Sequence, residues 1–173
     1  LVFSTLHTNS ASDSIPRLLN MGIRPFILAP SLRCIVAQRL ARRLCPNCKK
    51  KRQANQSEMA EISRVVENLN LRGEQIEFDG MVYEACGCSE CSNIGYKGQM
   101  LIAEVLYITD EIRQMVYSSP TSKDILDVAH RNGMRDMWEE GVCRVIRGDS
   151  TIDEIARNIE RQYGFYKNIL YNM

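Results

Sequence analysis

The chain has 173 residues, of which 45% are hydrophobic and 25% charged, with only five prolines. These values are typical of a globular protein and exclude a disordered tail. No apolar run approaches the roughly 18 residues that a membrane-spanning helix needs. Seven cysteines, an odd number arranged partly in C-x-x-C pairs, favour a reducing compartment over a disulfide scaffold. We therefore expect a cytoplasmic protein without a transmembrane segment.

The net charge of +1 conceals an uneven distribution. Residues 1–52 carry ten Lys or Arg and one Asp, a net charge of +9, whereas residues 53–99 have a net charge of −5 and residues 100–173 one of −3. Residues 38–52 contain seven positive charges and no acid. Such a strip is expected to face a polyanion or an acidic neighbour.

The first elements point to a chain that continues a larger α/β domain. The apolar residues Leu1–Phe3 precede a polar cluster, an order typical of a buried parallel strand that delivers polar groups at its carboxyl end. Because such a strand needs neighbours, we expect the chain to be the distal part of a longer protein. Two short helices follow, one from Ser12 or Asp13 to Met21 and one over residues 26–32. Residues 35–44 fit both strand and helix periodicity.

The remaining elements are mostly helical. Apolar residues at helical spacing predict a helix over residues 58–71, with Ser57 as its cap. Short strands are expected at residues 81–83 and 100–106. The C-terminal third predicts a small bundle of helices at residues 110–117, 123–132, 135–147 and 150–163, with Thr109, Ser122 and Ser150 as the expected N-terminal caps.

Two C-x-x-C pairs carry the strongest chemical signal. Cys45 and Cys48 are followed, after 39 intervening residues, by Cys88 and Cys91. Each pair places two thiolates on one tight turn, and two facing turns complete the tetrahedral sulfur shell that zinc favours. Four protein thiolates leave no open coordination position, so the zinc would be structural. A redox dithiol or a chance arrangement is the alternative.

The other cysteines have different interpretations. Cys86 makes the second pair ambiguous, because C-x-C-x-x-C offers three thiolates for two positions, and the spacing of the first pair favours Cys88 and Cys91. Cys34 and Cys143 lie among apolar residues and are interpreted as packing residues.

The basic strip beside the first pair has three interpretations. Lys49–Arg52 form one run without a nearby aromatic residue, which favours a solvated or intersubunit face over base contact. An anionic phospholipid surface is the third interpretation. We expect no nucleic-acid partner. His7, after the opening strand, is by itself either a hydrogen-bonded structural residue or a functional one.

Several motifs together resemble one family. The segments STLHTNSASDSIPRLLNMGI (residues 4–23), AQRLARRLCPNC (37–48), GCSECSNIGYKGQ (87–99) and AEVL (103–106) resemble the C-terminal region of the type II secretion and type IV pilus assembly ATPases. The resemblance is close over residues 2–106 and continues in order to about residue 156. It implies an α/β fold, the distal remnant of a RecA-like ATPase domain with an inserted tetracysteine zinc subdomain and a C-terminal helical subdomain.

The resemblance also implies a domain organisation and a nucleotide site. Residues 1–44 would end the RecA-like domain, 45–98 would form the zinc subdomain, and 99–173 a strand plus a helical subdomain. His7 would be the catalytic sensor of the γ-phosphate, with Thr5 and Thr8 supporting it and Arg39 a nucleotide or subunit-interface contact. The family's strand near residues 35–40 would pair with the strand at 100–106. The parent would use ATP and Mg²⁺, although this chain has no G-x-x-x-x-G-K-[ST] loop.

The function implied is that of a hexameric motor. The parent would be a homo-oligomer that hydrolyses ATP to drive type II secretion or type IV pilus assembly, in the cytoplasm and peripheral at the inner membrane, with a membrane platform protein as partner. Gln99 departs from the family, which commonly has Arg there. The tail from Gly164 to Met173 could form an apolar helical face through Phe165, Tyr166, Ile169 and Leu170. The alternative is a free-standing zinc-stabilised interaction or nucleic-acid-binding module.

Overall fold

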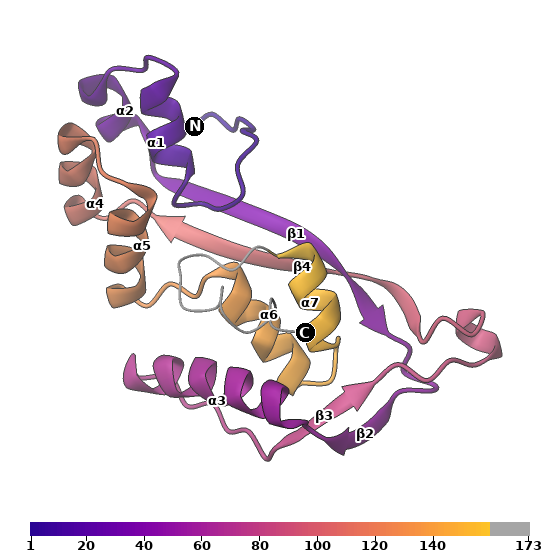
Figure 1. The fold of residues 1–173 in the computed structure, drawn as a ribbon. Helices are drawn as coiled ribbons and strands as arrows, with labels where there is room; N and C mark the ends of the chain where they lie inside the picture. The colour runs from indigo at the N-terminus through magenta and orange to yellow at the C-terminus, as the bar shows by residue number, and fades with distance from the viewer. Residues whose placement is uncertain (160–173) are drawn as a thin grey trace, which may run out of the picture. The chain divides into compact units, whose positions relative to one another are not determined.

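A computed structural model describes residues 1–159 of the chain, and the C-terminal tail considered above lies outside them (Figure 1). The chain divides into two compact units, which are described separately. Unit 1 combines Leu1–Gln38 with Ala103–Asp136, and unit 2 combines Arg39–Ile102 with the chain from Met137 onward. Among the described residues, no helix is long and apolar enough to cross a bilayer.

Two long strands belong to both units. β1 (Cys34–Leu44) pairs with β4 (Tyr96–Tyr107) in a two-stranded sheet, and the arrows run in opposite directions in Figure 1. The strand alternative for residues 35–44 and its pairing with the strand around residues 100–106, which the family resemblance implied, are thereby confirmed. Ala37 and Ala41 of β1, four residues apart and therefore on one face of the strand, are buried, and Leu44 is buried at its end.

Unit 1 is a small helical cluster. Its helices are α1 (Ser14–Asn20), α2 (Pro25–Ser31), α4 (Asp110–Met115), the 3-10 turn η2 (Val116–Ser118) and α5 (Ser122–Arg131). α2 packs on α4 and η2, and α1 packs on α5. The core is apolar and includes Ile15, Leu28, Ile112, Val116 and Ile125. Gly22, which follows α1, has a φ of 88°, the left-handed conformation that favours glycine, and the chain turns there toward α2.

Unit 2 is built on a second small sheet. β2 (Lys50–Gln53) pairs antiparallel with β3 (Met81–Glu84), with Lys50 opposite Glu84 and Gln53 opposite Met81. The unit also contains α3 (Gln56–Leu71), the 3-10 turn η1 (Ser89–Cys91), α6 (Met137–Ile146) and α7 (Ile152–Asn158). α3 buries Ile62, Val65 and Leu69 and contacts α6, which in turn packs on α7 and β3.

Several elements differ from the sequence-based expectation. Leu1–Phe3 form no strand and are exposed, because the described part of the chain offers them no strand to pair with. β2 was not predicted, since its lysine run has no apolar alternation. The C-terminal helices do not form one bundle: α4 and α5 belong to unit 1, and α6 and α7 to unit 2.

The predicted helices are present, with the last described as α7 to Asn158 and residues 160–163 of its predicted span outside the described residues, but three caps are shifted. Asn55, not Ser57, caps α3 in a reciprocal capping box with Glu58. Thr121, not Ser122, caps α5, and Thr151, not Ser150, caps α7. Thr109 caps α4 as expected. The true caps have extended backbone dihedrals that leave their side chains free to accept from the third residue on.

An ion pair joins the start of α7 to β1. Glu154, only 4% exposed, accepts hydrogen bonds from the backbone N–H of Arg42 at 2.9 Å and from its guanidinium Nη2 at 2.5 Å. The guanidinium also lies 4.3 Å above the ring centre of Tyr96 on β4, whose hydroxyl hydrogen-bonds Thr151. Burial alone would raise the pKa of Glu154, but the hydrogen bonds from Arg42 outweigh it and hold this pKa below its ordinary value of 4.5.

Replacing this carboxylate tests its contribution to stability. Glu154→Gln should lower the free energy of unfolding near neutral pH by about 2 kcal/mol, because the buried acceptor of a charged hydrogen bond is lost. The folded-state pKa of Glu154 is depressed, so its contribution is fully present above pH 4.5 and disappears as the pH falls through the lower folded value. Urea unfolding of both proteins across this range should show the difference shrinking with acid. A constant difference would contradict this account.

Candidate metal centre

The first C-x-x-C turn follows directly on strand β1. Cys45 comes after Leu44, the last residue of β1, and its carbonyl accepts from the N–H groups of Cys48 and Lys49 at 3.3 and 3.0 Å. This turn directs both side chains to one side. The N–H of Cys45 donates to the carbonyl of Gly95, at 2.9 Å, so the two C-x-x-C segments are joined by the backbone as well.

The second turn is formed by η1 and needs unusual backbone conformations. Ser92 and Asn93 have φ values of 53° and 61°, and the carbonyl of Cys88 accepts from Asn93 N–H at 2.9 Å. Gly87 and Gly95 flank the turn with φ values of 97° and 80°. A Cβ at Gly87 would lie 2.8 Å from the carbonyl oxygen of Asn93, and one at Gly95 2.6 Å from the Cβ of Ala85. Glycine is therefore required at both positions.

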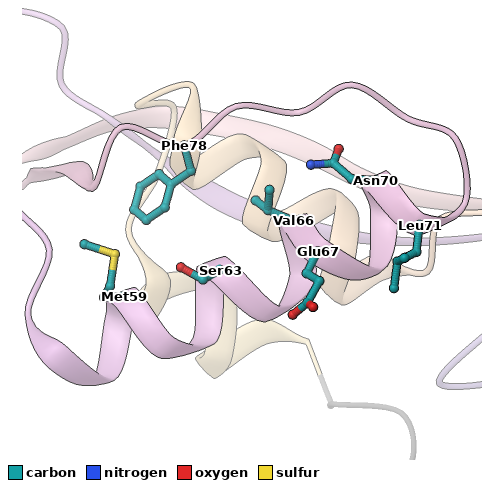
Figure 2. Close-up of a pocket in the computed structure, with 7 residues that line it drawn as sticks. All are labelled: Met59, Ser63, Val66, Glu67, Asn70, Leu71 and Phe78. Carbon is teal, nitrogen blue, oxygen red and sulfur yellow. The ribbon is translucent and has the colours of Figure 1, made fainter.

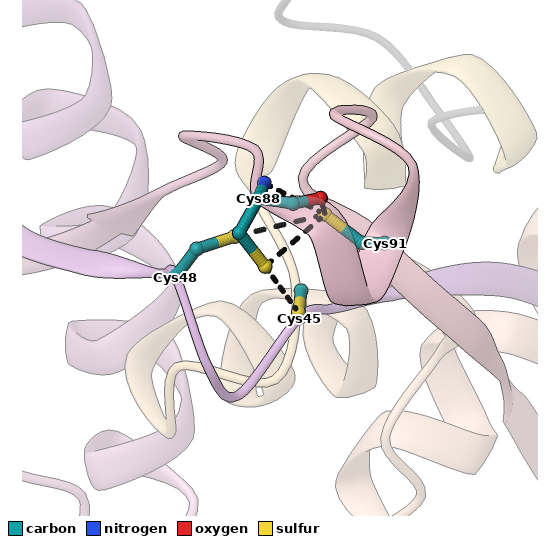
Figure 3. A group of neighbouring side chains, drawn as sticks. All are labelled: Cys45, Cys48, Cys88 and Cys91. Atoms are coloured by element: carbon teal, nitrogen blue, oxygen red, sulfur yellow. Dashed lines mark hydrogen bonds between the residues drawn. The ribbon is translucent and has the colours of Figure 1, made fainter.

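The four sulfurs meet at the spacing of a metal shell (Figure 3). The Sγ–Sγ distances are 3.9 Å for Cys45–Cys88, 3.8 Å for Cys48–Cys91 and 3.8 Å for Cys88–Cys91, and all four sulfurs lie within 4.8 Å of one another. Zinc–sulfur bonds of about 2.3 Å in a tetrahedron place neighbouring sulfurs about 3.8 Å apart. A disulfide would need about 2.05 Å. The cluster could therefore hold a metal ion, and its donor set and spacing fit zinc.

Hydrogen bonds to the sulfurs of Cys88 and Cys91 hold the pKa of these two thiols below its ordinary value, whereas burial raises the pKa of Cys48. The N–H groups of Cys88 and Gly95 donate to Cys91 Sγ at 3.3 and 3.2 Å. The amide of Asn47 donates to Cys88 Sγ at 3.4 Å and, as the main cause, lowers the pKa of this thiol to about 6. Cys45 and Cys91 are buried, while Cys48 and Cys88 are half-buried. Such outer hydrogen bonds fix the orientation of metal ligands.

The remaining cysteines lie outside the cluster. Cys86 is exposed and its thiol lies 3.8 Å from a carboxylate oxygen of Glu84, so the second pair is Cys88 and Cys91, as the spacing predicted. Cys143 is buried on α6, which confirms its interpretation as a packing residue. That interpretation is wrong for Cys34, which is exposed at the start of β1.

Most of the basic strip is paired within the chain. Lys51 contacts Asp79 at 2.9 Å, and Arg52 forms two hydrogen bonds of 2.7 Å with Glu58. The hydrogen bonds from Arg52 hold the pKa of Glu58 below its ordinary value. Together with the Arg42–Glu154 pair, they show that much of the strip is paired within unit 2, while Arg43, Lys50 and Lys51 remain exposed to solvent.

The cysteine cluster is tied to the turn between α6 and α7. The N–H of Leu44 donates to the carbonyl of Asp149 at 2.8 Å, and the ammonium of Lys49 donates to the carbonyl of Gly148 at 2.6 Å. Lys49 also lies 4.6 Å from the ring centre of Tyr83. A Cβ at Gly148 would lie 2.5 Å from that ring, so glycine permits the close contact. The residues around Cys45 thus hold the α6–α7 turn in place.

The residues expected at a nucleotide site lie in two places. Thr5 and His7 are exposed in the irregular N-terminal segment, and the Thr8 hydroxyl hydrogen-bonds Ser10 and Ser14. Arg39 lies on β1 within unit 2. Sequence reasoning missed Glu104, a fully buried residue of β4 whose carboxylate accepts from the N–H of Ala11 at 2.5 Å. A lone acid in an apolar strand is the signal that could have indicated it.

Comparisons with known proteins agree with this architecture. A family model described as type II/IV secretion system protein matches residues 1–157. The chain is 40% identical over 158 residues to the type IV pilus assembly ATPase PilB of Myxococcus xanthus, covering 91% of this chain and 27% of that protein. It is 36% identical over 163 residues to PilB of Thermus thermophilus, covering 92% and 17%. It is 35% identical over 157 residues to the type II secretion system protein E of Pseudomonas aeruginosa, covering 91% and 29%.

The described part of the molecule is an α/β protein with a candidate tetracysteine metal site. Because the family model covers nearly the whole chain, the protein belongs to the type II/IV secretion system protein family. The family resemblance expected from the sequence is confirmed. The chain spans 17% to 29% of the length of these three relatives.

Metal content tests the site directly. The purified chain should contain about one zinc ion per molecule by elemental analysis, because the four thiolates fit one tetrahedral ion. Cys88→Ser should lower this content. The control is the neighbouring exposed cysteine, and Cys86→Ser should leave the zinc content unchanged. Full zinc occupancy in Cys88→Ser would contradict the assignment of ligands.

Removing the metal should affect helices as well as the cysteine turns. A chelator is expected to increase hydrogen exchange first in residues 45–98 and also at the α6–α7 turn, because Lys49 and Leu44 hold that turn through its carbonyls. Exchange in α4 and α5 of unit 1 should change little. Unchanged exchange at Gly148–Thr151 after metal loss would disprove the link between cluster and turn.

Proposed function

We propose that this chain is the C-terminal part of a hexameric ATPase that powers type IV pilus assembly or type II secretion. The observation that carries the proposal is the match of residues 1–157 to the family, with relatives whose names include pilus assembly ATPases. The fold class proposed is the distal remnant of a RecA-like domain. ATP and Mg²⁺ would be bound by the complete protein, since this chain has no glycine-rich phosphate loop.

The proposed metal is zinc, held by Cys45, Cys48, Cys88 and Cys91. With four thiolates it has no free position for water or substrate, so its role is to stabilise a segment too small to fold around its own core. The chemistry that zinc supplies here is cross-linking of β1, η1 and the residues between them. The three-part organisation into residues 1–44, 45–98 and 99–173 stays a prediction.

His7 is proposed as the catalytic sensor of the γ-phosphate, with Thr5 and Thr8 beside it. Its exposure leaves the imidazole available to a ligand, and the Thr8 hydroxyl is held by Ser10 and Ser14. An imidazole there can exchange hydrogen-bond partners when the phosphate leaves. Arg39, on the strand that continues into the zinc segment, is proposed to contact nucleotide or a neighbouring subunit.

The proposed partners follow from the same machine. The parent would form a homo-oligomer in the cytoplasm, peripheral at the inner membrane, and would act on a membrane platform protein without binding nucleic acid. The rival hypothesis is a free-standing zinc-stabilised interaction module. The two differ in what must precede Leu1 in the gene, because only the motor needs an encoded phosphate-binding loop there.

A chimera tests the proposal. Residues 1–157 should replace the aligned C-terminal region of Myxococcus xanthus PilB and yield an oligomer that hydrolyses ATP, whereas the 173-residue chain alone should release no phosphate above the buffer background. In the chimera, His7→Ala should lower kcat by about tenfold to a hundredfold with little change in KM, because the histidine would act after nucleotide binding.

Three outcomes would each contradict a part of this proposal. A folded, zinc-loaded chimera that binds nucleotide but does not turn it over would show that residues 1–157 cannot complete such a site. An equal kcat in the His7→Ala chimera would remove His7 from the mechanism. Phosphate release by the isolated chain would show that it carries a nucleotide site of its own.

A further inference from the structure

Three arginines within and beside α1 and α2 form a second group of positive charge, separate in sequence from the basic strip. Residues 14–33 contain Arg17, Arg24 and Arg33 and no acidic residue. All three side chains are exposed, and among residues 1–159 none of them has a carboxylate partner. This contrasts with Arg42 and Arg52, each of which is bound by a glutamate. These arginines are therefore available to an acidic partner.

Apolar side chains lie between these arginines. Met21 is 59% exposed, Phe26 58% and Ile27 45%, and the guanidinium of Arg24 lies 4.9 Å from the ring centre of Phe26. α2 turns Leu28 and Ala29 toward α4 and η2 and leaves Phe26 and Ile27 uncovered. We call Arg17, Met21, Arg24, Phe26 and Ile27 the basic corner. Exposed apolar residues that are clustered and flanked by charge are typical of an interaction surface.

Unit 2 carries a groove whose one charged lining residue is acidic. It has a volume of about 510 Å³ and runs along α3 beneath the loop that follows the helix (Figure 2). Phe78 and Met59 lie at one end of the groove and Leu71, which is 80% exposed, at the other. The only charged residue in the lining is Glu67, and the full lining consists of Met59, Ser63, Val66, Glu67, Asn70, Leu71 and Phe78.

The surroundings of the groove are acidic. Residues 53–80 contain six acids and two arginines, and two of the acids, Glu58 and Asp79, are paired with Arg52 and Lys51. One of the arginines, Arg72, is bound to Glu139 at 2.5 Å. Glu67 and Glu77 are exposed, and within the described range neither forms an ion pair. The groove therefore combines an apolar floor with one lining carboxylate, Glu67, for which the described residues show no ion pair.

We propose that the basic corner of one copy of this chain docks on the α3 groove of a second copy. Phe26 and Ile27 would enter the groove between Met59, Phe78 and Leu71, and Arg24 would pair with Glu67. The charges of the two surfaces are complementary, and each has an uncovered apolar centre that the other can cover. The inference deepens the proposed function, on which it rests for the idea of a ring, by naming the surfaces through which copies would meet.

The symmetry of the contact follows from its composition. Two different surfaces meet, so the contact is heterologous, and in a pair of copies one corner and one groove remain unoccupied. Repetition closes into a ring when the rotation per copy allows it. The arginine–glutamate component is exposed at the rim, so added salt should weaken the association.

A charge swap tests the contact without nucleotide. Sedimentation velocity of the 173-residue chain at increasing concentration should show reversible self-association at low ionic strength. Arg24→Glu and Glu67→Arg should each weaken it by about tenfold, because each variant brings like charges together. An equimolar mixture of the two variants should associate again, because every corner then meets a groove of opposite charge, and the double variant should do the same.

Matched variants control for net charge and folding. Lys50→Glu changes the charge as Arg24→Glu does, at an exposed site on β2, and should leave the association unchanged. Asn68→Arg adds a cation to α3 outside the groove lining and should also be neutral. All variants change exposed residues, and equal zinc content and equal unfolding temperature would show that they fold.

Three results would overturn the proposal. A chain that stays monomeric at every concentration lacks the contact. A mixture that fails to restore the association of the two single variants shows that Arg24 and Glu67 do not pair. Binding of the monomeric chain to anionic phospholipid vesicles through Arg24 and Phe26 would assign the basic corner to a lipid surface. None of these results bears on ATP turnover by the chimera, so this inference and the proposed function fail separately.

Discussion

Four thiolates that meet at about 3.8 Å form the constraint on which the order of unit 2 depends. The two cysteine turns are separated by 39 residues, and this segment has only a four-residue strand pair and one long helix of its own. A core of that size rarely folds alone, and a metal ion held by the four sulfurs would supply the missing free energy through coordination bonds. The backbone hydrogen bond from Cys45 N–H to the Gly95 carbonyl then fixes two junctions: the one where β1 leads into the first cysteine turn, and the one where the second cysteine turn leads into β4.

The effect of this constraint extends to the C-terminal helices. Lys49 and Leu44 hold the carbonyls of the α6–α7 turn, and Arg42 binds the first turn of α7 through Glu154. Arg42 and Leu44 of β1 and Lys49 of the first cysteine turn thus all contact the short segment from residue 148 to residue 154. A change in the orientation of β1 would therefore be passed to α7 through hydrogen bonds, not through a flexible linker.

The sequence predicts features that depend on local spacing. The cysteine pairs were recognised because the C-x-x-C spacing by itself defines a turn, and the choice of Cys88 over Cys86 followed from symmetry. The helices were predicted from apolar periodicity, but their caps were shifted because Asn55 and Ser57, or Thr121 and Ser122, are equally good cap residues until the backbone dihedrals are known. Features that depend on distant partners were missed. β2 is a run of lysine and arginine that becomes a strand only beside β3, and Cys34 lies in an apolar sequence yet is exposed.

The most direct test of the account is X-ray absorption spectroscopy at the zinc edge on the purified chain. The account predicts four sulfur ligands at about 2.3 Å and no nitrogen or oxygen in the first shell. A mixed shell with oxygen or nitrogen would mean that the four cysteines do not complete the site. A metal-free protein with its cysteines oxidised in pairs would contradict the structural role assigned to the cluster.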